Sequence, residues 1–363
     1  MDSAQHLTAH LPDDLTDRLG ALRERAVREH WIDRLWRRDA TLWTGADEDR
    51  WLAWLDVAER ERPQAGELRE FATAVRAEGF TEALLLGMGG SSLGPEVLAT
   101  VFGHGPEALR LRILDSTDPA QVRAAATAGE LSKTLVVVAS KSGSTLEPHV
   151  FLEYFWDLLR EGRRFVAITD PGSKLEALAR QRGFRAVFHG EAQIGGRYSV
   201  LSRFGLVPAS LLGIDLDAFL GAAVEMSQRC RTAADPTENP GLELGLILGA
   251  CALAGRDKLT LIASPALWDV GAWVEQLVAE STGKVGKAIV PVDAEPLGPP
   301  SVYGDDRLFV YLELEGDAQP EQLLALADLA EAGHPVLRLR LADRHALAGE
   351  FVRWEIATAV AGA

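Results

Sequence analysis

The stretch "LLLGMGGSSLGPEVL", which runs from Leu84 to Leu98, decides the fold of this chain. It combines an apolar run, a glycine-rich turn and a continuation with helical character, which is the pattern of a strand–turn–helix unit. Three kinds of site need such a turn at the end of a strand. The turn could bind a dinucleotide, present a nucleophilic serine, or hold a sugar phosphate.

The same alternation of short apolar runs and helical stretches continues along the chain. The runs are EALLLG (82–87), LRLRILD (109–115), TLVVVAS (134–140), RFVAITD (164–170), KLTLIAS (258–264), RLFVYLEL (307–314) and PVLRLRL (335–341). This alternation predicts parallel sheets covered by helices on both faces, with ligands at the carboxyl ends of the strands. Gly87, Asp115, Ser140 and Asp170 stand at such ends.

The order of these patterns predicts an α/β protein with two doubly wound parallel-sheet lobes. Residues 1–80 form a predicted N-terminal helical segment, because Leu15, Leu19 and Trp31 recur near helical spacing. The first lobe is predicted over 81–215, a helical bridge over 216–255, and a second, smaller and incomplete lobe over 256–363.

Charge and composition limit the partners of the chain. The 363 residues carry a formal net charge of −16, which argues against nucleic acid and membrane surfaces as general partners because both are polyanionic. No apolar run reaches the length of a membrane span, and the first residues lack the apolar core of a signal peptide. The two cysteines, Cys230 and Cys251, fit neither a disulfide framework nor a zinc site. We therefore expect a cytoplasmic protein.

Two interpretations of the glycine-rich turn compete with phosphate binding. A dinucleotide fingerprint needs G-x-G-x-x-G, and here Ser92 stands in place of the third glycine that should follow Gly87. A nucleophile elbow needs G-x-S-x-G, which residues 90–94 match, with Ser92 as the nucleophile and His334 or His345 as later partners. That match leaves the other strand ends unexplained.

A second loop favours an anion site. The stretch "SKSGSTLEP", residues 140–148, follows an apolar strand and opens a helix. Its hydroxyl and cationic groups come from Ser140, Lys141, Ser142, Ser144 and Thr145, with Gly143 between them. Hydroxyls and exposed amides at a helix N-terminus bind phosphate. The alternative is helix capping, since Ser144 with Glu147 matches a capping box.

Two further stretches carry candidate catalytic groups. In "IGGRYSVLSRFGL", residues 194–206, two glycines precede Arg197, whose forked donors suit an anionic ligand. In "VEQLVAESTGK", residues 274–284, Gln276 and Glu280 are four residues apart and share a helix face. Burial of the Glu280 carboxylate in a cleft would make it a usable base, whereas a solvated last-turn glutamate is the plain alternative.

Together these four stretches resemble the glucose-6-phosphate isomerase family. The matching motifs are GMGGSSLGP, SKSGST, GGRYS and QLVAESTGK, in the order of the family and covering about residues 80–295. The loop SKSGST is also similar to the signature of sugar isomerase (SIS) domains. The segment RLWRRDATLW and residues 290–314 resemble the isomerase half of bifunctional transaldolase/glucose-6-phosphate isomerase proteins.

The resemblance implies two SIS-type lobes, an active site between them, a homodimer, and no metal or organic cofactor. It implies that Glu280 moves a proton between C2 and C1 of the open-chain sugar and that Arg197 stabilises the enediolate. The residues implied in substrate binding are Gly90, Ser91, Ser140, Lys141, Ser142, Gly143, Ser144, Thr145 and Gln276.

Two departures from the family keep a second hypothesis open. The ring-opening histidine of the family has its nearest counterpart in YGDDRLFVYL, residues 303–312, which contains no histidine. The family's terminal lysine would follow a segment that does not occur before Ala363. The second hypothesis is a SIS module that binds a sugar phosphate without turnover.

Overall fold

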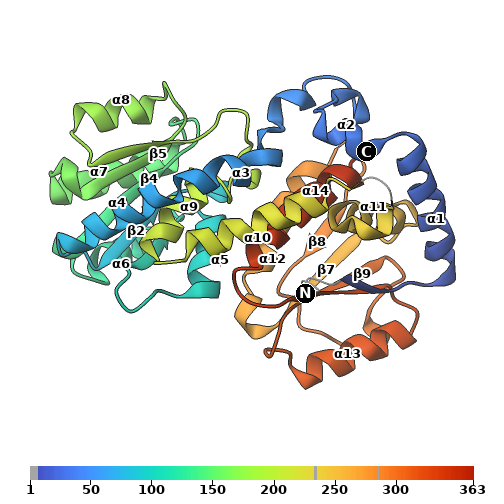
Figure 1. Cartoon of the computed structure of the whole chain (residues 1–363). Helices are drawn as coiled ribbons and strands as arrows, with labels where there is room; N and C mark the ends of the chain where they lie inside the picture. Colours follow the sequence, from blue (N-terminus) through green and yellow to red (C-terminus); the bar gives the residue numbers. More distant parts are fainter. Residues whose placement is uncertain (1–6, 233–234, 285) are drawn as a thin grey trace. The chain divides into compact units, whose positions relative to one another are not determined.

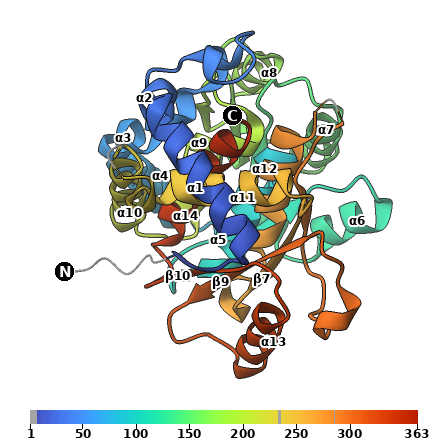
Figure 2. The same cartoon turned by 90° about the vertical axis from the view of Figure 1, so that its right-hand side faces the viewer.

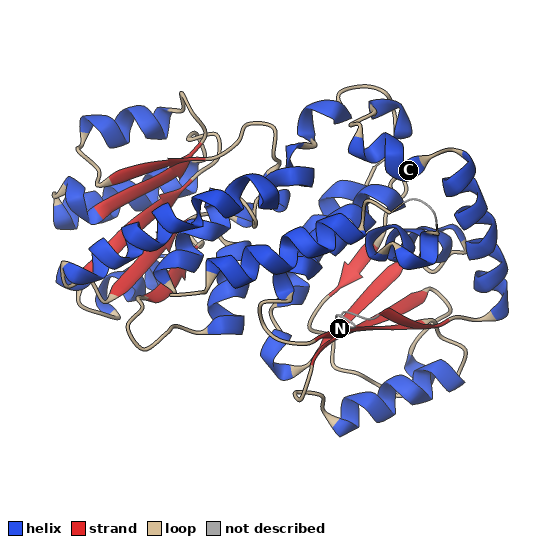
Figure 3. Cartoon of the chain, viewed as in Figure 1, coloured by secondary structure: helices blue, strands red, loops and turns tan. Residues whose placement is uncertain are grey.

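The computed structural model describes residues 7–232, 235–284 and 286–363, and the chain divides into two compact units. One unit is Asp56–Gly221, and the other combines the chain up to Leu55 with Ala222–Ala363. Each unit contains a sheet with helices packed on its faces (Figures 1 and 3). The predicted α/β class with two parallel-sheet lobes is therefore confirmed.

The unit Asp56–Gly221 is built on a fully parallel sheet of order β3-β2-β4-β5-β6. Its strands are β2 (Glu82–Leu86), β3 (Arg110–Leu114), β4 (Thr134–Ala139), β5 (Phe165–Thr169) and β6 (Ala186–His189). Its helices are α3 (Val57–Glu61), α4 (Ala65–Ala77), α5 (Leu93–Phe102), α6 (Pro119–Thr127), α7 (Leu146–Leu159), α8 (Lys174–Gln181), α9 (Arg203–Leu211) and the first part of α10 (Leu216–Arg229).

Both faces of this sheet are buried, which explains why its strands are apolar at successive positions. Leu84 and Val136 pack in one cluster with Phe151 of α7 and Leu175 of α8. The alternate strand positions, such as Val137, are also fully buried and face the opposite side. Because all strands of this sheet are parallel, their carboxyl ends lie at one edge of the sheet.

The second unit has a mixed sheet of order β1-β10-β9-β7-β8, in which only β1 is antiparallel to its neighbour. Its strands are β1 (Leu7–His10), β7 (Lys258–Ala263), β8 (Val290–Val292), β9 (Arg307–Leu314) and β10 (Val336–Leu341). Its helices are α1 (Asp13–Arg28), α2 (Trp31–Trp36), α11 (Pro240–Leu253), α12 (Val270–Thr282), α13 (Pro320–Glu331) and α14 (Leu347–Ala361). Helix α13 covers one face, and α11, α12 and α14 lie on the other (Figure 2).

The boundaries differ from those the sequence predicts. The N-terminal segment is not one helical unit, because β1 joins the sheet of the second unit and the chain changes unit after Leu55. The predicted bridge is likewise divided. Its first helix, α10, crosses the unit boundary, whereas α11 packs along α14. Gly245 of α11 permits this approach, because a Cβ there would lie 2.6 Å from the carbonyl oxygen of Ala357.

The described residues also show the state of the cysteines, the length of the apolar helices and the grouping of possible metal ligands. Cys230 and Cys251 are buried, unpaired thiols, and burial raises the pKa of both to about 12. None of the helices formed by the described residues is long and apolar enough to cross a bilayer. Among the same residues, no cluster of histidine, cysteine and carboxylate side chains could hold a metal ion.

Candidate active site

The glycine-rich turn after β2 lies against the turn that carries Arg197. The turns are two short 3-10 segments, Gly89–Ser91 and Gly196–Tyr198. A Cβ on Gly90 would lie 2.1 Å from the Gly196 carbonyl oxygen and 2.8 Å from the Arg197 amide nitrogen. No side chain fits there, so glycine at position 90 allows the Arg197 turn to lie beside the carboxyl end of β2.

Ser92 is poorly placed to act as a nucleophile. Its side chain is fully buried, and its hydroxyl donates to the Gly89 carbonyl oxygen over 3.1 Å. A nucleophile must be reached by its substrate, and the elbow motif works because it exposes the serine. The structure therefore argues against the serine-hydrolase interpretation, and Ser92 is a structural residue of the turn.

The loop after β4 presents four hydroxyl groups at the start of α7. Ser140 is buried, and its hydroxyl lies 3.3 Å from that of Thr145. The exposed hydroxyls of Ser142 and Ser144 lie 2.8 Å apart. Gly143 has a φ of +63°, and a Cβ there would lie 2.8 Å from the backbone nitrogen of Leu175, so the turn requires glycine.

Helix capping does not account for these hydroxyls. Thr145, not Ser144, is the N-cap of α7, and within the described residues it makes no side-chain capping hydrogen bond. The predicted capping box of Ser144 and Glu147 is thus not formed. The first amides of α7 are left for another acceptor, as an anion site requires.

The Lys141 side chain connects the loop 140–145 to two other segments. Its ammonium donates to the Asp170 carboxylate over 2.5 Å and to the Ala192 carbonyl oxygen over 3.1 Å. Asp170 follows β5 and Ala192 follows β6, so both lie at the same sheet edge as the loop. The Asp170 amide in turn donates to the Lys141 carbonyl oxygen over 3.0 Å.

Arg197 is half-buried and its guanidinium carbon lies 5.5 Å from the centre of the Tyr198 ring. A cation over an aromatic face is held in orientation by the quadrupole of the ring. The adjacent Ser199 hydroxyl donates to the Gly196 carbonyl oxygen over 2.6 Å, which fixes the turn. Arg197 is therefore a cation in a defined position.

Gln276 and Glu280 belong to the other unit and share one face of α12, as predicted. The Gln276 amide donates to the Glu280 carboxylate over 3.1 Å. Of the two environments that the sequence left open for Glu280, a cleft or solvent, the structure shows an exposed side chain. It lies in the last turn of α12, and the buried face of that helix is formed by Leu277 and Val278.

The structure thus brings the predicted site residues together in two groups, one in each unit. Gly90, Ser91, the loop 140–145 and Arg197 meet at the carboxyl edge of one sheet, and Gln276 and Glu280 form a pair on α12. Sequence reasoning missed the link made by Asp170. Its position at a strand end was visible, but its pairing with Lys141 depends on the order of β4 and β5 in the sheet.

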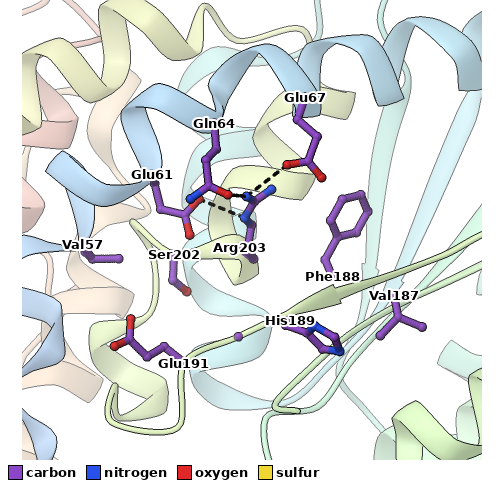
Figure 4. A pocket seen from close by; sticks show the side chains of 11 residues that line it. Val57, Glu61, Gln64, Glu67, Val187, Phe188, His189, Glu191, Ser202 and Arg203 are labelled. Carbon is purple, nitrogen blue, oxygen red and sulfur yellow. Dashed lines mark hydrogen bonds and ion pairs between the residues drawn. The ribbon is translucent and has the colours of Figure 1, made fainter.

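A separate cavity of about 450 Å³ lies in the unit Asp56–Gly221 (Figure 4). It is lined by Val57, Glu61, Gln64, Glu67, Val187, Phe188, His189, Gly190, Glu191, Ser202 and Arg203. Arg203 is neutralised there, since its guanidinium pairs with Glu61 over 2.9 Å and with Glu67 over 3.4 Å. Burial raises the pKa of Glu61 despite Arg203. The carboxylate-rich lining disfavours a phosphate, and none of the predicted site residues lines this cavity.

The two sheets and the hydroxyl-rich loop at a strand end define a SIS-type phosphosugar isomerase fold. The Phosphoglucose isomerase family profile matches residues 60–297, and the chain belongs to this family of enzymes. A glucose-6-phosphate isomerase of Synechococcus sp. is 39% identical over 56% of this chain and 40% of its own length. The chloroplastic glucose-6-phosphate isomerase 1 of Arabidopsis thaliana is 36% identical over 56% of this chain and 35% of its own length. The chain thus spans about 40% of the curated relatives it matches.

Solved structures share the fold over almost the whole chain. A hypothetical protein of Thermus thermophilus matches with a TM-score of 0.78 and 27% identity, over 98% of this chain and 94% of that one. A glucose-6-phosphate isomerase of Chlamydia trachomatis matches with a TM-score of 0.75 and 22% identity, over 99% of this chain and 84% of that one. These matches support the two-lobed architecture.

Proposed function

We propose that this chain interconverts glucose 6-phosphate and fructose 6-phosphate by aldose–ketose isomerisation. The observation that carries the proposal is the loop 140–145, whose hydroxyls are not used for helix capping and lie at the same sheet edge as Arg197. The family match over residues 60–297 supports the reaction class. A place in glycolysis and gluconeogenesis, a cytoplasmic location and a homodimer belong to the same proposal.

The phosphate of the substrate binds at the loop 140–145. Ser142 and Ser144 are exposed, with their hydroxyls 2.8 Å apart, and the Ser140 hydroxyl lies 3.3 Å from that of Thr145. With the first amides of α7 they supply donors at the positive end of a helix dipole. Gly90 and Ser91 line the sugar, which extends from the phosphate toward Arg197.

Proton transfer is assigned to Glu280. The carbonyl at C1 of the open-chain aldose makes the C2–H bond acidic, and the Glu280 carboxylate removes that proton. The electron pair forms a cis-enediolate whose negative charge Arg197 stabilises. Glu280 then returns the proton to C1, while the C2 hydroxyl becomes the ketone and its proton moves to the oxygen of C1. Gln276 holds the Glu280 carboxylate by its amide.

A second candidate function is binding of a sugar phosphate without turnover. It is favoured by the sequence YGDDRLFVYL (303–312), which follows Glu280 along the chain and lacks the ring-opening histidine that the family places there. One experiment distinguishes the isomerase from the binding module. The purified chain is given fructose 6-phosphate, and formation of glucose 6-phosphate is followed with a coupled dehydrogenase. Turnover supports the isomerase. Calorimetric binding of fructose 6-phosphate without turnover supports the binding module, and absence of both contradicts the two proposals.

A further inference from the structure

The ion pair of Lys141 and Asp170 lies where three segments of one unit meet. Lys141 belongs to the loop after β4, and Asp170 directly follows β5. The same ammonium donates to the carbonyl oxygen of Ala192, in the segment 190–196 that leads from β6 to Arg197. The side chains of Lys141 and Asp170 are 23% and 15% exposed, so the pair is largely shielded from solvent.

Asp170 is held in a fixed position on the backbone. Its amide donates to the Lys141 carbonyl oxygen over 3.0 Å. Its Oδ2 accepts from the Lys141 ammonium over 2.5 Å, while its Oδ1 is buried without a hydrogen-bond partner among the described residues. Gly190 makes room for that oxygen, because a Cβ on Gly190 would lie 2.8 Å from it. A buried carboxylate oxygen without a partner is costly, so the contact of the other oxygen with Lys141 is important for keeping Asp170 in this position.

The segment 190–196 is anchored from both sides. On one side the Lys141 ammonium binds the Ala192 carbonyl oxygen. On the other side the neighbouring Glu191 pairs with Arg60 at the end of α3. Ile194 is buried, and the next residues form the turn that presents Arg197. The Lys141 contact is therefore one of the anchors of the segment that leads to the Arg197 turn.

We propose that Asp170 is a positioning residue that acts through Lys141. It directs the ammonium to the Ala192 carbonyl, fixes the segment 190–196 and so places Arg197. The phosphate is then held by the hydroxyls and amides of the loop 140–145, and Lys141 is not its main counter-charge. This inference rests on the proposed isomerase function for its kinetic consequences, but its structural claim stands by itself.

In this arrangement Lys141 holds protein groups in place and is not a free ligand for the phosphate. An ammonium group has three donors, and two of the three are bound to Asp170 and Ala192. A displaced Arg197 weakens stabilisation of the enediolate, which lowers kcat and leaves ground-state phosphate binding almost unchanged. A lost phosphate ligand raises KM instead.

The kinetic test uses Asp170→Asn and Lys141→Met, with Asp217→Asn as the matched control. Asp217 forms an exposed ion pair with Arg69 in the same unit. We expect Asp170→Asn and Lys141→Met each to lower kcat roughly 10- to 100-fold, the range expected for a small misplacement of a catalytic group, with KM changed less than about threefold. We expect Lys141→Arg, which keeps the charge, to recover most of kcat. A KM increase of about tenfold or more in Lys141→Met with kcat retained would overturn the inference.

A measurement without ligand separates this inference from the proposed function. Hydrogen–deuterium exchange is followed for peptides covering residues 190–197 in wild type, Asp170→Asn, Lys141→Met and Asp217→Asn, together with their melting temperatures. We expect faster exchange in this peptide for the first two variants, without global unfolding, and no change for the control. Unchanged exchange in both variants contradicts the inference, even if the wild type isomerises sugar phosphates. Faster exchange supports it even if the wild type shows no turnover.

Discussion

Gly90 and Gly196 meet backbone to backbone: a methyl group on Gly90 would lie 2.1 Å from the Gly196 carbonyl oxygen. The two residues belong to motifs more than one hundred positions apart, and each motif has a glycine where they touch. The contact joins the turn after β2 to the turn that carries Arg197. Two sequence patterns that could each be a simple loop are therefore parts of one structure.

Substitution of Gly90 by alanine tests this contact. The added methyl meets backbone atoms of Gly196 and Arg197, which cannot rotate away as a side chain could. We expect a loss of about 3 kcal/mol in the free energy of unfolding, at the upper end for overpacking, and loss of isomerase activity. Chemical denaturation and the coupled assay measure both.

Gly66→Ala is the matched control for Gly90→Ala. Gly66 lies in α4 of the same unit, where the nearest atom to an added Cβ is the end of the Arg69 side chain at 3.8 Å. Alanine in a helix removes backbone entropy from the unfolded chain, so we expect a change of less than about 1 kcal/mol, in the stabilising direction. Equal destabilisation by Gly66→Ala and Gly90→Ala would show that the Gly196 contact is unimportant.

Ser92→Ala separates the isomerase from a serine hydrolase. The Ser92 hydroxyl donates within its own turn, to the Gly89 carbonyl oxygen, so its removal costs roughly 1 kcal/mol of stability. We expect kcat and KM for fructose 6-phosphate to stay within about threefold of the wild type, because no interaction with the transition state is removed. A complete loss of activity in a variant with a normal melting temperature would reopen a catalytic role for Ser92.

The Glu176 carboxylate links stability of the unit Asp56–Gly221 to pH. The Gly172 amide, His189 and Arg180 lower the pKa of Glu176 from 4.5 to about 2. A lowered folded-state pKa stabilises the fold above about pH 4.5, and this stabilisation disappears as the pH falls toward 2. We expect Glu176→Gln to be less stable than wild type at pH 7.

The difference between Glu176→Gln and wild type should shrink steadily below pH 4.5 and nearly vanish near pH 2. Urea unfolding at a series of pH values measures it. The exposed Glu107, replaced by glutamine, serves as the control and should show no such trend. A Glu176→Gln deficit that stays constant with pH would mean that the carboxylate contributes by packing and not by its charge.

The local patterns of the sequence were sufficient to predict the long strands and the loops that follow them. Runs such as TLVVVAS are apolar at nearly every position because both faces of the sheet are covered, and that signal is strong. The short strands β1, β6 and β8 contain only three or four residues each, too few to show a period. They are strands because a neighbouring strand supplies their hydrogen bonds, which a single stretch of sequence does not reveal.

The sequence predicted which residues belong to the candidate site better than it predicted their burial and their partners. Spacing placed Gln276 and Glu280 on one face of a helix, and they form a hydrogen bond there. The exposure of Glu280 and the pairing of Lys141 with Asp170 depend on how helices and strands pack. The sequence therefore left burial and solvation of Glu280 open, and it did not indicate a partner for Lys141.

The central claim is that Glu280 moves the proton between C2 and C1, and isotope exchange tests it most directly. Fructose 6-phosphate is incubated in D₂O with wild type, Glu280→Gln, and the exposed control Glu275→Gln from the same helix, and deuterium at C1 and C2 is followed by NMR. We predict incorporation with wild type and Glu275→Gln, and none with Glu280→Gln although it still binds fructose 6-phosphate. Undiminished incorporation with Glu280→Gln would contradict the account.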